Sequence, residues 1–362
     1  MKIGIIGTRG IPNHYGGFEQ FAEYVSVGLV EMGHEVSVYC PHNHPEQAER
    51  WKGVQRILVN DPEEKWGTVG QFFYDFNSIW DARKRNFDVI LQLGYTSSSI
   101  WGPLMPSAKI FTNMDGLEWK RSKFSKPIQM FLKFAERMAI WYSDEWISDS
   151  LGIQEYLKKK YNKESTYIAY GAWPFNSPDS TVLQKYQVQE NQYFMLVARM
   201  EPENNVEVIL DGYVESGSKI PFLVVGKTEN AFGKSLVEKF KGVQGIRFQG
   251  GIYNLDDLNQ LRFHSRAYFH GHSVGGTNPS LLEAMASQAF IIAHQNVFNQ
   301  SILGDDAWYF QNMSSLATLI SKTEEIDFLH HKKFMIDSNF QKIKEHFSWD
   351  NIIHQYEKLL TK

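Results

Sequence analysis

The sequence predicts an α/β protein with two doubly wound, Rossmann-like domains. Short apolar runs of strand length alternate with longer amphipathic segments of helical period along most of the chain, which is typical of β-α-β units in a parallel sheet. The 362 residues exceed what one hydrophobic core usually organises, so two domains are expected. Two prolines among small polar residues at 173–180 interrupt the alternation and indicate a linker.

The alternation predicts the individual elements in order. In the first half, strands are predicted at Lys2–Ile6, Glu35–Tyr39, Val54–Val59, Asp88–Leu93, Lys109–Thr112, Glu145–Ser148 and Thr166–Ala169, and helices at Phe18–Glu31, Val69–Arg83, Ile128–Tyr142 and Ile153–Tyr161. In the second half, strands are predicted at Tyr193–Ala198, Phe222–Val225, Ile246–Phe248, Ala267–Phe269, Phe290–Ala293 and Ala307–Phe310, with helices that include Val206–Glu215 and Leu281–Ala286. The tail has a helical period from about Phe328 onward.

These elements predict two domains and a last helix. The first domain is expected to cover residues 1–172 and the second residues 173–346. A C-terminal helix at about 347–362 is expected to pack back on the first domain. Two such domains joined by one linker predict a cleft between them, at which the carboxyl ends of both sheets can meet.

Composition and charge narrow the class of protein. A hydrophobic share of 43% and a charged share of 22% are typical of a globular chain, and a net charge of −4 gives no overall reason to expect nucleic-acid binding. The single cysteine, Cys40, cannot form an intramolecular disulfide, and Met1–Ile5 leads into a strand rather than a signal peptide. We expect a cytoplasmic protein that, if it meets a membrane, lies on its surface.

The loop after the first strand, Gly7–Glu19, is rich in glycine. Glycines at a strand-to-helix turn let backbone amides approach a phosphate or a sugar closely. The spacing is not G-x-G-x-x-G, and Tyr39-Cys40-Pro41 stands where a dinucleotide fold needs an acidic residue, so NAD binding is disfavoured. The plain alternative is a tight turn with nothing bound.

Two places in the second half have the chemistry of a nucleotide site. The segment Phe269–Ala286 ends a strand, crosses a Gly-rich loop and begins a helix at Pro279, so that Glu283 can accept two hydrogen bonds from a ribose diol. Arg199 ends the first strand of this half and suits a diphosphate. The plain alternatives are a carboxylate that complements the helix dipole and an interdomain salt bridge.

A fourth segment and two histidine clusters complete the candidates. Asp115 and Glu118 follow a strand where an acceptor hydroxyl could lose its proton, although Asp before Gly is also ordinary turn chemistry. The runs Cys40–His44 and His270–His272 do not supply three or four ligands at a metal-site spacing. A histidine that faces the cleft and binds sugar hydroxyls is the favoured interpretation.

These segments together resemble the family 4 retaining glycosyltransferases of the GT-B fold, over nearly the whole chain. Within that family the resemblance is to the bacterial polysaccharide rhamnosyltransferase-like subgroup. The residues that carry it are Gly7–Pro12, Tyr15–Glu19, Gly33–Val36, Asp115–Arg121 and Asn278–Ala286. The resemblance implies a nucleotide sugar in the C-terminal domain, an acceptor in the N-terminal domain and glycosyl transfer across the cleft.

The resemblance also implies roles for single residues. Catalytic roles fall to Asp115, Arg199 and Glu283. The donor is expected to contact Gly16, Gly17, Arg199, Lys227, Gly276, Thr277, Asn278 and Glu283. The acceptor is expected to contact Tyr15, Asp115, Glu118, Lys120 and Arg121.

Two positions depart from the family pattern. Its E-x7-E pair needs a glutamate at position 275, where this chain has Gly275. Its usual lysine five residues after the arginine is replaced by Asn204. We therefore assign Lys227, at the end of the next strand, as a substitute phosphate cation.

The implied reaction transfers a hexose, L-rhamnose from dTDP-rhamnose, onto a polyprenyl-diphosphate-linked saccharide with retention at the anomeric carbon, by front-face attack. The donor is dTDP- or UDP-linked, no cofactor is needed, and the absence of a D-x-D triplet predicts that no metal ion is needed. Two alternatives stay open: a nucleotide-sugar 2-epimerase on the same fold, and a non-catalytic nucleotide-sugar-binding protein.

The segment Trp119–Met138 concentrates positive charge. It contains six basic residues and one acid, Glu136, interleaved with apolar side chains. Such a stretch suits docking on anionic lipid headgroups, where a lipid-linked acceptor is found. The plain alternative is a core-facing apolar stripe with a solvated basic rim.

Overall fold

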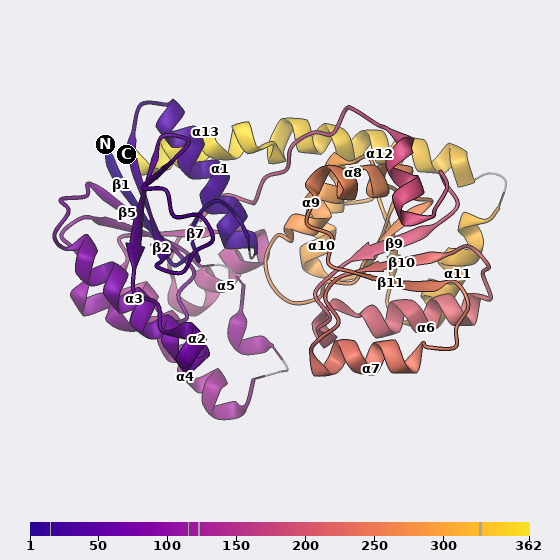
Figure 1. The fold of residues 1–362 in the computed structure, drawn as a ribbon, viewed down its shortest axis with the longest axis horizontal. Helices are drawn as coiled ribbons and strands as arrows, with labels where there is room; N and C mark the ends of the chain where they lie inside the picture. The colour runs from indigo at the N-terminus through magenta and orange to yellow at the C-terminus, as the bar shows by residue number, and fades with distance from the viewer. Residues whose placement is uncertain (15, 115, 122–123, 326–327) are drawn as a thin grey trace. The chain divides into compact units, whose positions relative to one another are not determined.

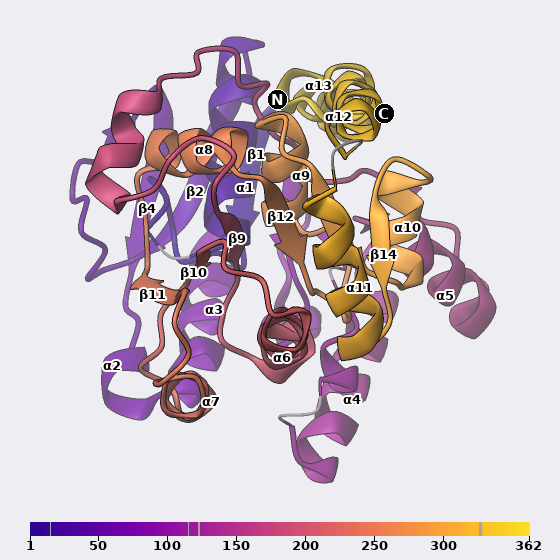
Figure 2. The same cartoon turned by 90° about the vertical axis from the view of Figure 1, so that its right-hand side faces the viewer.

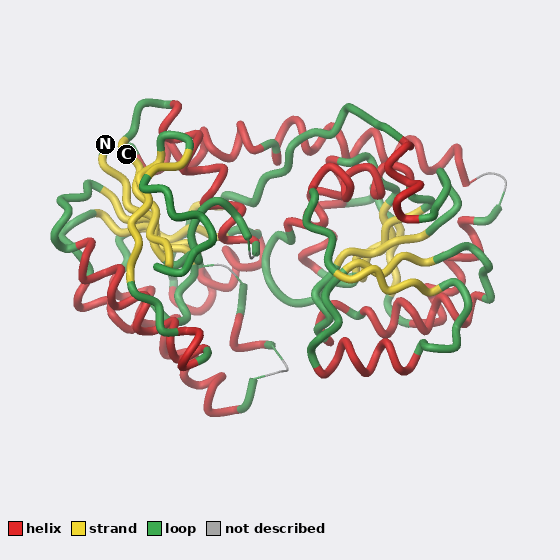
Figure 3. Tube along the Cα trace, viewed as in Figure 1, coloured by secondary structure: helices red, strands yellow, loops and turns green. Residues whose placement is uncertain are grey.

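The computed structural model describes all residues except 15, 115, 122–123 and 326–327. The chain forms two compact units, which are described separately. The first unit comprises Met1–Gly171 and Trp349–Lys362, and the second comprises Ala172–Ser348. Both are α/β, with strands enclosed by helices (Figure 1 and Figure 3). The sequence predicts that the chain passes from the first domain to the second after residue 172. It predicts that the chain returns to the first domain near residue 347.

The first unit is built on an eight-stranded sheet of order β3-β4-β2-β1-β5-β6-β7-β8. Its strands are β1 (Lys2–Ile6), β2 (Glu35–Pro41), β3 (Arg50–Trp51), β4 (Val54–Val59), β5 (Val89–Leu93), β6 (Lys109–Asn113), β7 (Glu145–Ser148) and β8 (Thr166–Tyr167). All neighbours pair in parallel except β3, which is antiparallel to β4. The central strands are buried on both faces and therefore show as continuous apolar runs in the sequence.

Helices cover both faces of this sheet. They are α1 (Gly17–Glu31), α2 (Glu63–Trp66), α3 (Thr68–Ala82), α4 (Lys126–Tyr142), α5 (Leu151–Tyr161) and α13 (Trp349–Leu360), with 3₁₀ turns η1 (Ser99–Leu104) and η2 (Glu118–Lys120). Figure 1 shows α1 and α13 on one side of the sheet and α2, α3 and α4 on the other. The last helix packs on α1 through Tyr356, whose ring centroid lies 4.9 Å from that of Phe21.

The second unit has a six-stranded parallel sheet of order β11-β10-β9-β12-β13-β14. Its strands are β9 (Phe194–Val197), β10 (Phe222–Val225), β11 (Ile246–Gly250), β12 (Ala267–His270), β13 (Ile291–His294) and β14 (Trp308–Phe310). Its helical segments are η3 (Ser180–Tyr186), η4 (Pro202–Asn204), α6 (Val206–Ser216), α7 (Ala231–Lys239), α8 (Leu255–His264), α9 (Pro279–Ala286), α10 (Val297–Leu303), α11 (Met313–Thr323), α12 (Phe328–Lys342) and the π-helical η5 (Ile343–Phe347). Figure 2 shows α6 and α7 on one side of this sheet and α8 on the other.

The topology positions the candidate loops. The chain crosses from β9 to β10 and later enters β12, so β9 lies between β10 and β12 at the centre of the second sheet. Because these strands are parallel, the loops that follow them emerge at one edge of the sheet. In the first unit β1 lies between β2 and β5, and the loops after β1 and β5 likewise share an edge.

Candidate functional site

Two loops of the second unit are clamped together at the carboxyl edge of its sheet. The 3₁₀ turn η4 follows β9, and the segment from Gly271 follows the neighbouring β12. A side chain at Gly271 would place its Cβ 2.1 Å from the carbonyl oxygen of Asn204, so the two backbones meet there only because residue 271 is glycine. The backbone amide and hydroxyl of Ser273 both donate to the Glu203 carbonyl, at 3.0 and 2.8 Å.

The side chain of Asn204 completes this clamp. Its Nδ2 donates to the Arg199 carbonyl at 2.8 Å, and its Oδ1 lies 3.0 Å from Nδ1 of His272. The amide that replaces the family's lysine therefore holds the two loops together and supplies no charge. The guanidinium of Arg199 is exposed and forms no ion pair or hydrogen bond within the part of the chain that the structure describes.

The backbone of the loop from 274 to 278 does not suit the glutamate that the family pattern places at position 275. Gly275 has φ +124°, a conformation that L side chains rarely adopt, and its position for a Cβ lies 3.2 Å from Nε2 of His272. A glutamate at 275 would thus need a different loop backbone. Thr277 is buried beside the half-buried Gly276.

Asn278 acts as a helix cap. Its side-chain Oδ1 accepts a hydrogen bond from the Ser280 amide at 2.9 Å and so caps α9, with Pro279 in the first turn. The sequence prediction that the Asn278 side chain binds the donor therefore meets a competing structural role: its oxygen already stabilises the helix start. Its amide nitrogen is the group that could still contact a ligand.

Glu283 is paired with a residue that the motif does not contain. Its Oε2 lies 2.6 Å from Nη2 of Arg262, whose side chain is completely buried at the end of α8. The Glu283 side chain keeps 17% of its surface exposed. The buried guanidinium fixes this carboxylate in place, a positioning that the sequence did not predict because Arg262 looks like a solvated residue in the last turn of a helix.

Lys227 lies at the same edge of the sheet as Arg199. Val197 pairs with Val225, so both cations stand two residues beyond paired positions on β9 and β10. Gly226, which lies between Val225 and Lys227, approaches the Ala198 carbonyl so closely that a Cβ would lie 2.0 Å from its oxygen. The exposed Lys227 ammonium lies 5.4 Å from the centre of the Tyr253 ring.

The histidine cluster of the second unit differs from the prediction in one respect. His270 is 3% exposed, so it is a residue of the core and its ring cannot face a sugar freely. Burial lowers its pKa well below the usual histidine value, and the neighbouring His272 and His294 act in the same direction. Its ring is therefore neutral, whereas His272 is half-buried at the loop clamp.

In the first unit, the glycine-rich loop is closed by its own first-turn glutamate. Glu19 is 3% exposed, and its Oε1 accepts hydrogen bonds from the Arg9 amide at 2.7 Å and from the Thr8 hydroxyl at 3.2 Å. Gly16 precedes α1 as its extended N-cap residue, and Gly17 begins the helix. The predicted acceptor residue Tyr15 lies outside the described residues.

A buried arginine that the sequence did not single out supports the same loop. Arg56 of β4 is 2% exposed and donates to the carbonyls of Ile11 and Glu46 at 2.8 and 2.7 Å. Its Nη2 also lies 3.0 Å from Nδ1 of His44. His44 is thereby engaged in holding the loop. Among the described residues there is no group of three or more side chains suited to hold a metal ion.

The predicted acceptor segment is only partly described. Asp115 lies outside the described residues, as does Lys123 of the basic stretch. Glu118 and Arg121 pair with each other, with 2.6 Å between Oε1 and Nη2. The ammonium of Lys120 lies 5.6 Å from the centre of the Trp119 ring. Two residues predicted to contact the acceptor therefore partner each other.

A buried carboxylate of α4, Glu136, anchors this segment. Glu136 is 1% exposed and its Oε2 accepts from the Trp119 indole at 3.0 Å. Its Oε1 accepts from Lys160, Tyr156 and Tyr161, at 2.7, 2.8 and 2.5 Å. Four donors on one carboxylate join η2 to α4 and α5. Sequence spacing could have found it, since Glu136 falls four residues after the buried Leu132, on the apolar face of α4.

A second buried carboxyl lies beneath the loops after β1 and β5. Asp75 of α3 is 4% exposed and accepts one hydrogen bond, from the Ser97 hydroxyl, at 2.6 Å. Burial raises its pKa to about 7. The adjacent Tyr74 donates to the Thr8 carbonyl at 2.8 Å.

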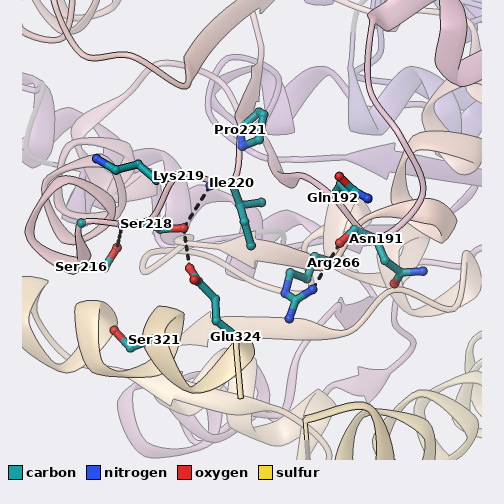
Figure 4. A pocket seen from close by; sticks show the side chains of 11 residues that line it. Asn191, Gln192, Ser216, Ser218, Lys219, Ile220, Pro221, Arg266, Ser321 and Glu324 are labelled. Atoms are coloured by element: carbon teal, nitrogen blue, oxygen red, sulfur yellow. Dashed lines mark hydrogen bonds between the residues drawn. The ribbon is translucent and has the colours of Figure 1, made fainter. Parts of the chain in front are cut away.

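A cavity of about 560 Å³ lies elsewhere in the second unit, at the amino-terminal ends of β9, β10 and β12 (Figure 4). Two of its charged side chains are engaged: Glu324 accepts from the Ser218 hydroxyl at 2.6 Å, and Arg266 Nε donates to the Thr323 carbonyl at 3.0 Å. None of the predicted site residues lines it. The candidate site is at the other edge of the sheet.

We compared the chain with known protein families, sequences and structures. A family model described as a domain of unknown function, DUF1972, matches residues 105–173, which include Glu118, Arg121 and Glu136. No curated protein sequence matches the chain. Solved structures match it along its whole length. The chain has the GT-B fold.

Three solved structures illustrate the match. Sucrose-phosphate synthase from Thermosynechococcus elongatus has a TM-score of 0.81 at 16% identity, over 99% of this chain and 98% of its own. HepE from Anabaena, solved in complex with UDP-glucose, has a TM-score of 0.77 at 14% identity, over 100% and 99%. WaaG, a glycosyltransferase involved in lipopolysaccharide biosynthesis, has a TM-score of 0.73 at 13% identity, over 100% of both chains. At these identities the likeness establishes the fold.

Proposed function

We propose that the protein is a glycosyltransferase that takes a hexose from a nucleotide-diphosphate sugar and transfers it to a lipid-linked saccharide in surface polysaccharide assembly. The observation that carries the proposal is the clamped loop pair of the second unit, which presents the exposed Arg199 guanidinium at the carboxyl edge of a GT-B sheet. Similar full-length structures hold UDP or UDP-glucose. An arginine that has no protein partner among the described residues suits a diphosphate, because its paired donors match phosphate oxygens.

The donor roles follow from this placement. Arg199 and Lys227 neutralise the diphosphate from neighbouring strand ends. The amides of Gly276 and Thr277 offer donors to phosphate and sugar. In the first turn of α9, Pro279 has no N–H and the amides of Ser280 and Leu281 already donate to Asn278. Glu283, held by Arg262, accepts from the ribose hydroxyls through the part of its carboxylate that stays exposed.

The proposed chemistry is a retaining transfer by front-face attack. An acceptor hydroxyl oxygen forms a bond to the anomeric carbon on the face from which the diphosphate leaves, and the hydroxyl proton passes to the departing phosphate oxygen. Stabilising the leaving phosphate is then the largest contribution that the protein can make. Asp115 keeps the acceptor-binding role that the resemblance implies, and Gly16 and Gly17 contribute amides to the sugar side.

The proposed donor is dTDP-L-rhamnose and the proposed acceptor is a polyprenyl-diphosphate-linked saccharide at the cytoplasmic face of a membrane. Both rest on the resemblance of the loop and acceptor motifs to polysaccharide rhamnosyltransferases. The reaction is proposed to need no metal ion because the sequence lacks a D-x-D triplet. Loss of turnover on addition of EDTA, restored by Mg²⁺ or Mn²⁺, would contradict that part.

A second candidate is a non-catalytic nucleotide-sugar-binding protein. Two observations favour it: the backbone at position 275 has a conformation that a glutamate would rarely adopt, and Asn204 uses its side chain to hold loops together. Such a protein would bind the donor and turn over none.

The deciding experiment combines binding with turnover. Thermal unfolding is measured with dTDP, UDP and GDP and with their sugars, since a ligand that binds only the folded state raises the midpoint. The nucleotide sugars that bind are then incubated with lipid-linked saccharides, and the product is identified by mass. Transfer supports the proposal, binding without transfer to any acceptor supports the second candidate, and no binding by any nucleotide contradicts both.

A further inference from the structure

Exposed aromatic side chains gather on one part of the first unit. Among the residues that the structure describes, ten aromatic side chains are exposed, and seven of them lie on α2, α3 and α4. Those seven are Trp66, Phe73, Trp80, Phe131, Phe134, Trp141 and Tyr142. An apolar concentration of this kind on a water-facing surface marks an interaction site.

The exposed apolar residues repeat with the same spacing on two helices. On α3, Val69, Phe73 and Trp80 are separated by four and seven residues. On α4, Met130, Phe134 and Trp141 have the same separations, and all six side chains are exposed. Separations of four and seven residues align side chains along one stripe of a helix. Each helix therefore has one apolar stripe toward its own sheet and a second, uncovered one.

The two uncovered stripes form one surface. The Phe72 ring of α3 lies 5.5 Å from the Phe131 ring of α4, measured between centroids, so the helices touch through aromatic side chains. Trp66 at the end of α2 extends the stripe of α3, with its ring 4.9 Å from that of Phe73. Figures 1 and 2 both show α2, α3 and α4 below the sheet of the first unit. We call these exposed apolar residues of α2, α3 and α4 the aromatic face.

Basic residues accompany the aromatic face, and nearby acids are turned away or paired. Lys126, Lys133 and Arg137 of α4 are exposed and follow each other at seven and four residues, beside the apolar stripe. The only acid of α4, Glu136, is buried and bonded to Lys160. The surface of α4 is therefore more positive than its sequence indicates.

The acidic side chains of α2 and α3 are likewise buried or hydrogen-bonded. Asp75 is buried, and Asp81 is bonded to Arg85 and to the Tyr39 hydroxyl. Glu63 pairs with Arg9 at 2.8 Å. The exposed Glu64, bonded to the Asn43 amide at 2.8 Å, is the acid that remains at the edge.

We propose that the aromatic face docks on an anionic lipid bilayer, with its aromatic rings at the headgroup level and its cations on lipid phosphates. Tryptophan beside lysine and arginine is the combination that membrane interfaces favour. A second copy of the chain is the poorer occupant, because a two-fold interface would bring the cations of α4 against each other. No helix within the described residues is long and apolar enough to cross a membrane.

This inference deepens the proposed function and rests on it for its purpose, since a lipid-linked acceptor is found at such a surface. It adds α2 and α3 to the membrane contact, whereas the sequence pointed only to Trp119–Met138. The aromatic face belongs to the first unit, and the donor loops belong to the second. Lipid binding and donor binding can therefore be tested independently.

The test is co-sedimentation of the full chain with vesicles of phosphatidylcholine alone and of phosphatidylcholine with phosphatidylglycerol. Three variants probe the face: Trp80→Ser on α3, the double variant Phe134→Ser with Trp141→Ser on α4, and the triple variant of Lys126, Lys133 and Arg137 to Gln. Matched controls are Phe334→Ser and Lys234→Gln, exposed residues of the second unit. Thermal unfolding confirms that each variant is folded.

Wild-type protein is expected to bind only the anionic vesicles. Trp80→Ser and the α4 double variant should each weaken binding about tenfold, and the triple variant about a hundredfold, at about fivefold for each cation. The controls should bind like wild type. Absence of binding to anionic vesicles at low salt would overturn the inference, as would a dimer in sedimentation equilibrium that Trp80→Ser dissociates. Nucleotide binding without vesicle binding would contradict this inference alone, and the reverse result would contradict the proposed function alone.

Discussion

The loops after β9 and β12, proposed to bind the donor (the donor loops), and the segment around Trp119, proposed to bind the acceptor (the acceptor segment), are held in different ways. In the second unit, backbone contacts and short amides within the motifs hold the loops, as Asn204 and Gly271 show. In the first unit, Trp119 is held by Glu136, a residue of the following helix and outside the motif. Contacts between two loops therefore hold one candidate region, whereas the other depends on a single buried carboxylate outside its motif.

The largest expected effect comes from breaking the buried ion pair of the second unit. Glu283→Ala leaves the fully buried Arg262 guanidinium without its carboxylate and should lower the free energy of unfolding by about 3–5 kcal/mol. Urea unfolding measures it. The double variant Arg262→Met with Glu283→Met should recover most of that loss, and a double variant as unstable as the single one would show that the pair is not the cause.

Glu136→Gln removes the charge of the buried carboxylate and is expected to lower the free energy of unfolding by about 2–3 kcal/mol. Lys160 then stays beside a neutral group, and one strong acceptor is weakened. The acceptor KM should rise in Glu136→Gln while the donor affinity stays unchanged, since the donor loops do not depend on this residue. Steady-state kinetics with each substrate varied in turn separates the two. Glu145→Gln, at a more exposed carboxylate, is the control. An equal loss of donor affinity would contradict the comparison.

The buried Asp75 makes the free energy of unfolding depend on pH. Its pKa is raised to about 7, above the unfolded value, so its contribution to stability is intact below about pH 4 and is lost as pH rises to about 7. Asp75→Asn should therefore be more stable than wild type at pH 8, by about 4 kcal/mol, and show little gain at pH 4. Urea unfolding at both pH values provides the measurement. A gain of equal size at both would contradict the assignment.

The smallest expected effect concerns the loop clamp. Asn204→Ala removes the hydrogen bonds to Arg199 and His272 and should weaken nucleoside diphosphate binding about tenfold, with little change in the acceptor KM. Titration calorimetry with the nucleotide that binds best measures it. Unchanged affinity would show that the loops keep their arrangement without the amide.

Much of the fold was accessible from the sequence because buried parallel strands appear as apolar runs. The predicted strands Lys2–Ile6, Val54–Val59 and Phe222–Val225 match β1, β4 and β10 residue for residue. The two-residue strand β3 was not predicted, since two residues carry no period. The GT-B fold that the resemblance implied is the fold of the chain.

The candidate site was accessible in part. Glycine positions and the start of α9 follow from local turn and helix rules, so Gly275, Gly276 and Pro279 could be singled out. The side chains that fix the site could not, because their partners are distant in sequence: 21 residues separate Arg262 from Glu283, and 45 separate Arg56 from Ile11. One sequence gives no period or spacing that joins such pairs.

The most direct test of the central claim is the binding of nucleoside diphosphates to wild type and to Arg199→Ala, followed by thermal unfolding. Arg247→Ala, at a half-buried arginine of β11, is the control. At least one of dTDP, UDP and GDP is expected to raise the unfolding midpoint of wild type and of the control, and Arg199→Ala is expected to lose this rise. A rise of the same size in Arg199→Ala, or no rise with any nucleotide in wild type, would contradict it.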